Sequence, residues 1–380
     1  MSDHIKRLLR RWLGKHQVRK KSQTRIARRH HVIPQLYLAG FTDSGEKDGL
    51  LYAHDLRELK TWRAKPANVA FVKNFYKIDV PTIDTDEIER VFCELEGAAA
   101  KVLKKIIRTS KLPCRRKHYN VLMHFMAQLV VRRPSVRESV TKSIDQVLRM
   151  VAGMYAGLPD ADLQRHLERL RAHNPDLPGT TLRQFREFIK SDDYTIEFSQ
   201  NFHINNLLSA LLPTADDTIA PLLAARHWVL WVAQDDAGHF ITTDRPVLLT
   251  WTIEVPPFYA DSPGFGLQNT LVLFPISKRL ALYGRFEGPR RLTLPADADQ
   301  VALINRMMSY GVVRFIYSTD ENFAWKKLVD GRIGDTRDLF DAIKDHQAKK
   351  AATAKPKIEG DVPAMADVAE IIPSQASRKE

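Results

Sequence analysis

The sequence has little cysteine and no long apolar run. Its two cysteines, Cys93 and Cys114, do not have the spacing of a CxxC motif. We therefore expect neither a disulfide framework nor a thiolate zinc site, and this cysteine usage fits a reducing, cytoplasmic location. The most apolar stretch, residues 228–233, has only the length of a strand, so the sequence predicts no transmembrane segment.

The sequence also lacks the short motifs that identify common enzyme classes. It contains no His-x-x-x-His pair, no phosphate-binding loop of the form G-x-x-x-x-G-K-[ST], and no G-x-S-x-G nucleophile elbow. The N-terminus is charged but has no apolar region of signal-peptide length. These absences leave cofactor, substrate and reaction unspecified.

What the sequence has instead is a strong separation of charge. Residues 1–29, the basic arm, hold eleven Lys or Arg residues and one acidic residue, Asp3, and so supply +10 of the formal net charge of +13. From His30 onward, 47 basic residues stand against 44 acidic ones. Because a cationic segment attracts polyanions, we expect the arm to contact nucleic acid or an anionic membrane surface.

The two parts of the basic arm favour different partners. Residues 14–29 have no apolar stripe, which predicts a flexible linker suited to a nucleic-acid backbone. A solubilising extension without a partner is a further interpretation, and the sequence leaves nucleic acid, a membrane surface and no partner all open. The apolar residues of the first part recur at helical spacing and predict a short amphipathic helix suited to a membrane surface: Ile5, Leu8, Leu9, Trp12 and Leu13.

Beyond the arm, the hydrophobic pattern predicts an α+β fold in one domain over residues 30–345. Helical periodicity dominates residues 84–212, approximately, and strand patterns dominate residues 227–330. Short turns between successive strands favour a mostly antiparallel sheet, on which we expect the helical block to pack. Residues 346–380, rich in Ala, Lys, Pro and Ser without periodicity, predict a disordered tail.

Several short patterns occur in order along the chain. They are His-His-x-x-Pro-x-x-Tyr-Leu-x-x-Phe at residues 30–41, Lys-Asn-Phe-Tyr at 73–76, Phe-x-x-Gln-x-x-x-Arg-x-Pro at 125–134, Phe-Ile-Thr-Thr-Asp-Arg-Pro at 240–246 and Leu-Phe-Pro-Ile-Ser at 273–277. With these patterns the chain resembles, over residues 28–317 approximately, the bacterial family catalogued as domain of unknown function 4238. Arg245 departs from the family pattern, which has Asn there. The resemblance implies a bacterial source and one family domain, and it implies no activity.

The adjacent histidines His30 and His31 are the first candidates for a polar cleft. Neutral imidazole can act as a general base or bind a metal ion near neutral pH. Neighbouring side chains of a strand point to opposite faces, so we expect only one of the two to serve a given site. The alternative is that one histidine makes a buried hydrogen bond while the segment docks on the core.

Four further polar residues complete the candidate cleft. Gln128 and Arg132 lie four residues apart on one face of a predicted helix. Arg132 could bind a carboxylate or phosphate ligand, or it could pair with Glu96 or Asp244 and lock the helical block to the sheet. Glu96 lies beside the buried face of the first long helix. Asp244 follows a strand, where its carboxylate could face a cleft or form a turn.

These residues support two hypotheses about function. The first is a binding or regulatory protein whose basic arm holds nucleic acid or another anionic partner. The second is a metal-dependent hydrolase, for instance a nuclease, in which His31, Glu96 and Asp244 bind a divalent metal ion while Gln128 and Arg132 orient the substrate. The hydrolase hypothesis requires all five residues to converge in the folded chain.

Overall fold

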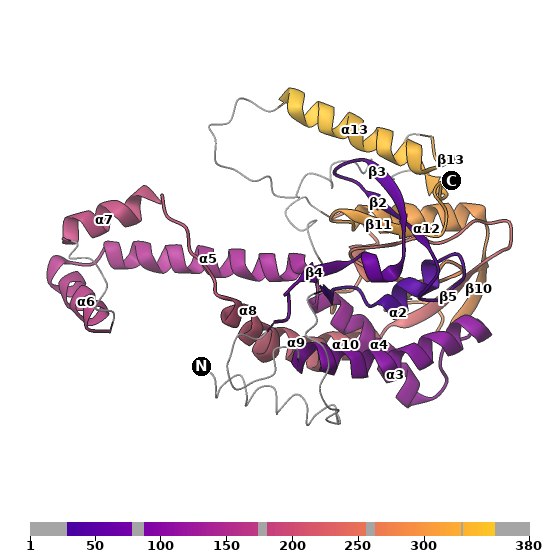
Figure 1. Ribbon diagram of the computed structural model, residues 1–380, viewed down its shortest axis with the longest axis horizontal. Coiled ribbons are helices and arrows are strands. Elements are labelled where there is room, and N and C mark those ends of the chain that lie inside the picture. The colour runs from indigo at the N-terminus through magenta and orange to yellow at the C-terminus, as the bar shows by residue number, and fades with distance from the viewer. Residues whose placement is uncertain (1–28, 78–86, 174–180, 256–262, 328–329, 354–380) are drawn as a thin grey trace. The chain divides into compact units, whose positions relative to one another are not determined.

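The computed structural model describes residues 29–77, 87–173, 181–255, 263–327 and 330–353 (Figure 1). The basic arm, apart from Arg29, lies outside the described residues, and so do residues 354–380 of the predicted tail. The chain divides into two compact units. Unit 1 comprises Met1–Arg133 and Ile204–Glu380, and unit 2 comprises Pro134–His203. The sequence predicts one family domain over residues 30–345, and unit 2 is an insertion within that range.

Unit 1 begins with a short segment that carries the histidine pair. Strand β1 (Arg29–His31) pairs antiparallel with β4 (Phe71–Lys73). Between them lie α2 (Gln35–Leu38) and two single 3-10 turns, η1 (Ala39–Phe41) and η2 (Pro66–Asn68). The Tyr37 hydroxyl lies 2.6 Å from the carbonyl oxygen of Pro275, to which it donates, and 2.8 Å from Thr242 Oγ1. The Tyr and Phe of the 30–41 pattern are therefore core residues that dock this segment on the sheet.

The helices of unit 1 follow the predicted periodicity. After α3 (Glu87–Thr109) and α4 (Arg116–Val131), the chain passes through unit 2. It returns in a helical stretch made of α8 (Gln200–Asn206), η3 (Leu207–Leu211), α9 (Leu212–Thr214), η4 (Ala215–Ile219) and α10 (Ala220–Ala224), in which η3 and η4 are π-helical. This stretch ends beyond the predicted limit of residue 212.

The stretch Gln200–Ala224 is, among the described residues, one helix long and apolar enough to cross a membrane by length and composition. Length and composition are weak evidence, since buried core helices meet the same criterion. Several of its apolar side chains, Leu207, Leu212 and Leu223 among them, belong to the main hydrophobic core.

A five-stranded sheet forms the largest β structure of unit 1. Its order is β10 (Leu292–Ala296), β5 (His227–Ala233), β9 (Leu280–Arg285), β8 (Thr270–Ser277) and β7 (Leu248–Trp251). The pairs are antiparallel except β10 with β5, which is parallel. The mostly antiparallel sheet predicted from the sequence is thus present with one parallel edge.

A second sheet pairs strands that lie far apart in the sequence. Its order is β3 (Lys60–Ala64), β2 (Leu51–Asp55), β11 (Phe315–Ser318) and β6 (Thr242–Thr243), with antiparallel pairing throughout. The predicted α+β class is confirmed. The remaining elements are α12 (Ala298–Tyr310), α13 (Thr336–Thr353) and the small pair β12 (Trp325–Lys326) with β13 (Ile333–Gly334).

Helix α13 corrects the predicted boundary of the tail. The sequence pattern placed a disordered tail from residue 346, whereas the helix continues to Thr353. The apolar residues that hold α13 in place, Leu339, Phe340 and Ile343, lie near its start and pack in a small core cluster with Trp325. The polar second half continues the helix without an apolar stripe of its own, which is why the pattern suggested a tail.

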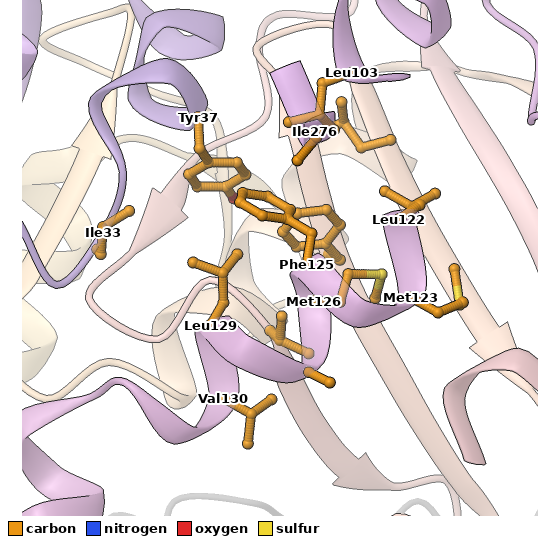
Figure 2. Close-up of a cluster of buried hydrophobic side chains, with 14 of the residues drawn as sticks. Ile33, Tyr37, Leu103, Leu122, Met123, Phe125, Met126, Leu129, Val130 and Ile276 are labelled. Carbon is orange, nitrogen blue, oxygen red and sulfur yellow. The ribbon is translucent and has the colours of Figure 1, made fainter. Parts of the chain in front are cut away.

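The main core of unit 1 lies where α4 meets the first segment and the five-stranded sheet. Figure 2 shows Leu122, Phe125 and Met126 of α4 close to Tyr37 and Ile276. The Tyr37 ring stacks on Phe274 of β8 at a centroid distance of 5.3 Å. This packing fixes the rotation of α4 about its axis, and hence the direction of its polar residues.

Unit 2 is a set of helices with little buried apolar surface. It contains α5 (Pro134–Ala156), α6 (Asp160–His173) and α7 (Leu182–Ser191). Its fully buried apolar residues, within the part of the unit that the structure describes, are Ala156, Leu163 and Leu167. The second half of α5 exposes several large apolar side chains instead: Val147, Leu148, Met150, Val151, Met154 and Tyr155.

Candidate functional site

Arg132, at the end of α4, is the centre of a buried polar cluster. Its side chain is 2% exposed. Its Nη1 donates to Glu96 Oε1 at 2.6 Å, its Nη2 to the His31 carbonyl at 3.0 Å, and its Nε to the Tyr76 hydroxyl at 3.3 Å. The guanidinium also lies 3.9 Å from the centroid of the Phe92 ring. Every guanidinium nitrogen therefore has a protein partner.

The charge of Arg132 is stabilised by this cluster. Burial lowers the pKa of Arg132, but Tyr76 and Glu96 more than offset burial, so the pKa lies above its usual value. The pairing with Glu96 is one of the alternatives that the sequence left open, and it joins α4 to α3. Arg132 also holds the backbone of β1, so it positions the segment that carries the histidine pair.

His30 faces the core and is fully buried. Its Nδ1 accepts a hydrogen bond from the backbone N–H of Tyr76 at 2.6 Å, and its ring stacks on the Tyr76 ring at a centroid distance of 5.6 Å. Because Nδ1 accepts, the proton of the neutral ring is on Nε2. The buried hydrogen bond predicted for one histidine of the pair is therefore made by His30.

His31 points to the opposite side of β1 and is half-buried. Burial lowers the pKa of His31 below its usual value, and the nearby positive charges of Arg132 and Arg29 lower it further, against backbone hydrogen bonds to Ala67 and Pro66. Its ring nitrogens lie 3.4 Å from Gln35 Nε2. Burial and the two arginines thus disfavour the charged imidazole, whose ring lies 6.0 Å from the Phe71 ring of β4, centroid to centroid.

Asp244 binds the backbone of a neighbouring strand. Its Oδ1 accepts the N–H of Val313 at 2.8 Å, and its Oδ2 accepts the N–H groups of Arg314 and Phe315 at 2.6 and 3.0 Å. Burial raises the pKa of Asp244, and these three hydrogen bonds act against that rise. Asp244 therefore bonds backbone donors, as the turn-forming alternative implied, but the donors belong to a distant segment and not to a local turn.

Asp244 interacts electrostatically with Arg245 and Arg133 rather than with Arg132. Burial lowers the pKa of Arg133 to about 10, the positive charge of Arg245 lowers it as well, and Asp244 raises it. Arg245 occupies the position where the family pattern has Asn. Its Nε is buried and has no hydrogen-bond partner within the described part of the chain.

The predicted metal ligands do not form a site. His31, Glu96 and Asp244 are all among the described residues, and within those residues no group of three or more His, Cys, Asp or Glu side chains is placed to hold a metal ion. The reason is that Glu96 pairs with Arg132 while Asp244 binds the start of β11. Of the six candidate residues, the structure brings together His30, His31, Glu96 and Arg132, and it leaves Asp244 and Gln128 outside that cluster.

Gln128 faces a groove between α3 and α4. Its side chain is 4% exposed and makes no hydrogen bond within the described residues. The groove has a volume of about 610 Å³. The residues that line it are Leu95, Ala98, Arg116, Lys117, Asn120, Val121, His124, Phe125 and Gln128. Gln128 was a candidate from the sequence, whereas Arg116, Lys117 and Asn120 were not, although Arg116 and Asn120 continue its four-residue spacing toward the N-terminus.

A comparison with protein-family models confirms the resemblance seen in the sequence. The model described as "Protein of unknown function (DUF4238)" matches residues 29–322. No curated protein and no solved structure matches the chain.

Proposed function

The chain belongs to the DUF4238 family, and we propose that it is a nucleic-acid-binding protein whose basic arm, residues 1–29, contacts the phosphate backbone. The observation that carries the proposal is the separation of charge, because the arm supplies +10 of the net +13 while the rest of the chain is nearly neutral. A polycation of this kind releases counterions when it binds nucleic acid, and that release drives association. The proposal includes a bacterial cytoplasmic location, because neither of the two exposed cysteines is in a disulfide and this fits a reducing environment.

The geometry around Arg132 favours binding over hydrolysis. A metal-dependent hydrolase needs carboxylate and imidazole ligands that are free to bind the ion. Glu96 is paired with Arg132, and the Asp244 oxygens accept three backbone N–H groups. Glu96, Arg132 and Asp244 thus support the fold, and the charge of the basic arm is what supports the binding proposal.

The test compares the full chain with a variant that lacks residues 1–28. Binding to fluorescein-labelled duplex DNA and single-stranded RNA is measured by fluorescence anisotropy over a series of salt concentrations. We expect the full chain to lose affinity as salt increases, with a log–log slope of about −0.9 for each phosphate contacted on duplex DNA. We expect the truncated chain to lose binding while it unfolds at the same temperature as the full chain.

A matched variant separates nucleic acid from a membrane surface. Leu9→Ser with Trp12→Ser preserves the charge of the arm and removes apolar side chains, so nucleic-acid binding should be unchanged. Retained nucleic-acid binding in the truncated chain would overturn the proposal. So would a full chain that binds phosphatidylserine vesicles but no nucleic acid, with vesicle binding lost in the double variant. Metal-dependent cleavage of the DNA or RNA that Glu96→Gln abolishes would instead support the hydrolase.

A further inference from the structure

The groove between α3 and α4 has the dimensions of a small-molecule site. The two helices lie side by side in unit 1 (Figure 1). The groove volume of about 610 Å³ lies within the range of roughly 300–1,000 Å³ that is typical of ligand pockets. Leu95 and Ala98 of α3 form one wall, and residues of α4 from Arg116 to Gln128 form the other wall and the floor.

A polar stripe runs along the α4 side of the groove. Arg116, Asn120, His124 and Gln128 recur every four residues and so lie on one face of the helix. Their exposure falls along this stripe. Arg116 and Asn120 are exposed, the His124 side chain is 40% exposed, and Gln128 is 4% exposed. The groove is therefore open at the N-terminal end of α4 and closed at Gln128.

The open end of the groove favours an anion. The side chains of Arg116 and Lys117, both exposed, line it at the start of α4, where the helix presents free backbone N–H groups and the positive end of its dipole. No side chain caps this helix, and its first turn contains no acidic residue. Both the side chains and the backbone of this end thus attract negative charge.

The closed end favours a hydrogen-bonding group on a largely apolar body. The Gln128 amide lines the groove with no hydrogen-bond partner within the described residues, so a polar group of a ligand there can donate to or accept from it. Beside it, Leu95, Val121 and Phe125 provide apolar wall. His124 is held from the other side by Asp216, whose Oδ1 lies 3.1 Å from His124 Nδ1.

We propose that this groove binds a small amphipathic anion. Its phosphate, sulfonate or carboxylate group lies at Arg116 and Lys117, its apolar body lies against Val121 and Phe125, and a polar group pairs with the Gln128 amide. The proposal rests on the groove alone and goes beyond the binding of nucleic acid by the arm. Loss of nucleic-acid binding in the arm truncation would leave it unaffected.

The test uses 1-anilinonaphthalene-8-sulfonate, an amphipathic fluorescent anion, with the full chain. Fluorescence titration gives its affinity, which we expect to fall about tenfold or more in the double variant Arg116→Glu, Lys117→Glu, since each substitution replaces attraction with repulsion. Ala98→Trp should block the groove and abolish the saturable signal. The matched control is Lys101→Glu with Lys105→Glu, which makes the same charge change at exposed α3 residues outside the groove lining and should retain wild-type affinity.

Competition identifies the source of the anion. Displacement of the probe by decyl phosphate would indicate a lipid-like ligand, and displacement by adenosine monophosphate a nucleotide-like one. Displacement by neither would overturn the proposal. The control variant losing as much affinity as the groove variant would also overturn it, as would an Ala98→Trp protein that retains wild-type near-UV circular dichroism and wild-type affinity. Asn120→Trp, at an exposed position of α4, provides the same blocking test if Ala98→Trp does not fold.

Discussion

Polar side chains near the histidine pair are hydrogen-bonded to one another within unit 1, and they stabilise the fold. Arg132 is bonded to Glu96, to the His31 carbonyl and to Tyr76, and it is nearly inaccessible to solvent. A buried charge in such an arrangement is costly to remove, because the partners that remain are left unpaired away from water. The cluster therefore acts as an internal brace between α3, α4 and β1.

The variant Arg132→Met tests this brace. Breaking a buried ion pair from one side costs about 3–5 kcal/mol, so we expect a large fall in the free energy of unfolding. Arg63→Met is the matched control, because the Arg63–Asp43 pair is roughly half exposed on both sides and such a pair contributes at most about 1 kcal/mol. Urea unfolding followed by circular dichroism measures both. Equal midpoints for the two variants would show that Arg132 does not brace the fold.

His54 gives the fold a dependence on pH. It is fully buried, its Nε2 lies 2.7 Å from Ser318 Oγ and its Nδ1 lies 3.0 Å from Thr61 Oγ1. Burial lowers the pKa of His54 from 6.5 to about 4. As the pH falls, His54 is therefore protonated near pH 6.5 in the unfolded chain but only near pH 4 in the folded chain. The contribution of His54 to stability is fully present above pH 6.5 and decreases as the pH falls toward 4.

The measurement compares the wild type with His54→Gln at pH 7.5 and pH 5. One unit of pKa corresponds to about 1.4 kcal/mol, so His54 should cost the wild type about 2 kcal/mol over this interval. The glutamine variant is expected to be less stable at pH 7.5 and to lose less stability than the wild type on acidification. If both proteins have the same difference in unfolding free energy between the two pH values, His54 is not the titrating group.

Helix α4 uses its two faces differently, one for the core and one for the groove. Helix α4 buries Leu122, Met126 and Leu129 against the core (Figure 2), while its polar stripe from Arg116 to Gln128 lines the groove. In the five-stranded sheet, Trp228 of β5 lies opposite Gly284 of β9, and the indole covers the glycine. The Trp228 Nε1 donates to the Leu223 carbonyl at 2.9 Å, which fixes the ring in this position.

Two glycine-to-alanine variants should change stability in opposite directions. A Cβ at Gly284 would lie 2.7 Å from Cζ3 of the Trp228 ring, so Gly284→Ala should destabilise the sheet by about 1–3 kcal/mol. A Cβ at Gly97, inside α3, would meet nothing within 4 Å, so Gly97→Ala should stabilise the protein by about 0.5–1 kcal/mol through helix propensity. Thermal unfolding measures both shifts. A Gly284→Ala protein that melts at or above the wild-type temperature would contradict the packing described for Trp228.

The basic arm, the Arg132 cluster and the groove are formed by different parts of the chain. The net positive charge is concentrated in residues 1–29, while the Arg132 cluster and the groove are formed by residues beyond the arm. Unit 2, Pro134–His203, interrupts the sequence of unit 1 between α4 and the helical stretch that returns at Ile204. The net charge therefore describes the arm and gives no information about the groove or the core.

The sequence by itself determined the local structure and the family. Helical periodicity predicted a helical region over residues 84–212, approximately, which contains α3, α4 and α5, because the spacing of apolar side chains records which face of a helix is buried. The ordered short patterns identified the family that matches residues 29–322. The alternation of side chains on a strand predicted that His30 and His31 would face opposite ways, as they do.

Only the tertiary structure decided what each buried face packs against. The sequence left Glu96 and Asp244 as equal partners for Arg132, and the path of the chain brought Glu96 to it while Asp244 bonded the backbone of β11. The groove beside Gln128 likewise exists because α3 and α4 pack side by side, and no pattern within either helix reports that contact. Periodicity specifies that a side chain is buried, whereas its partner depends on contacts between residues far apart in the sequence.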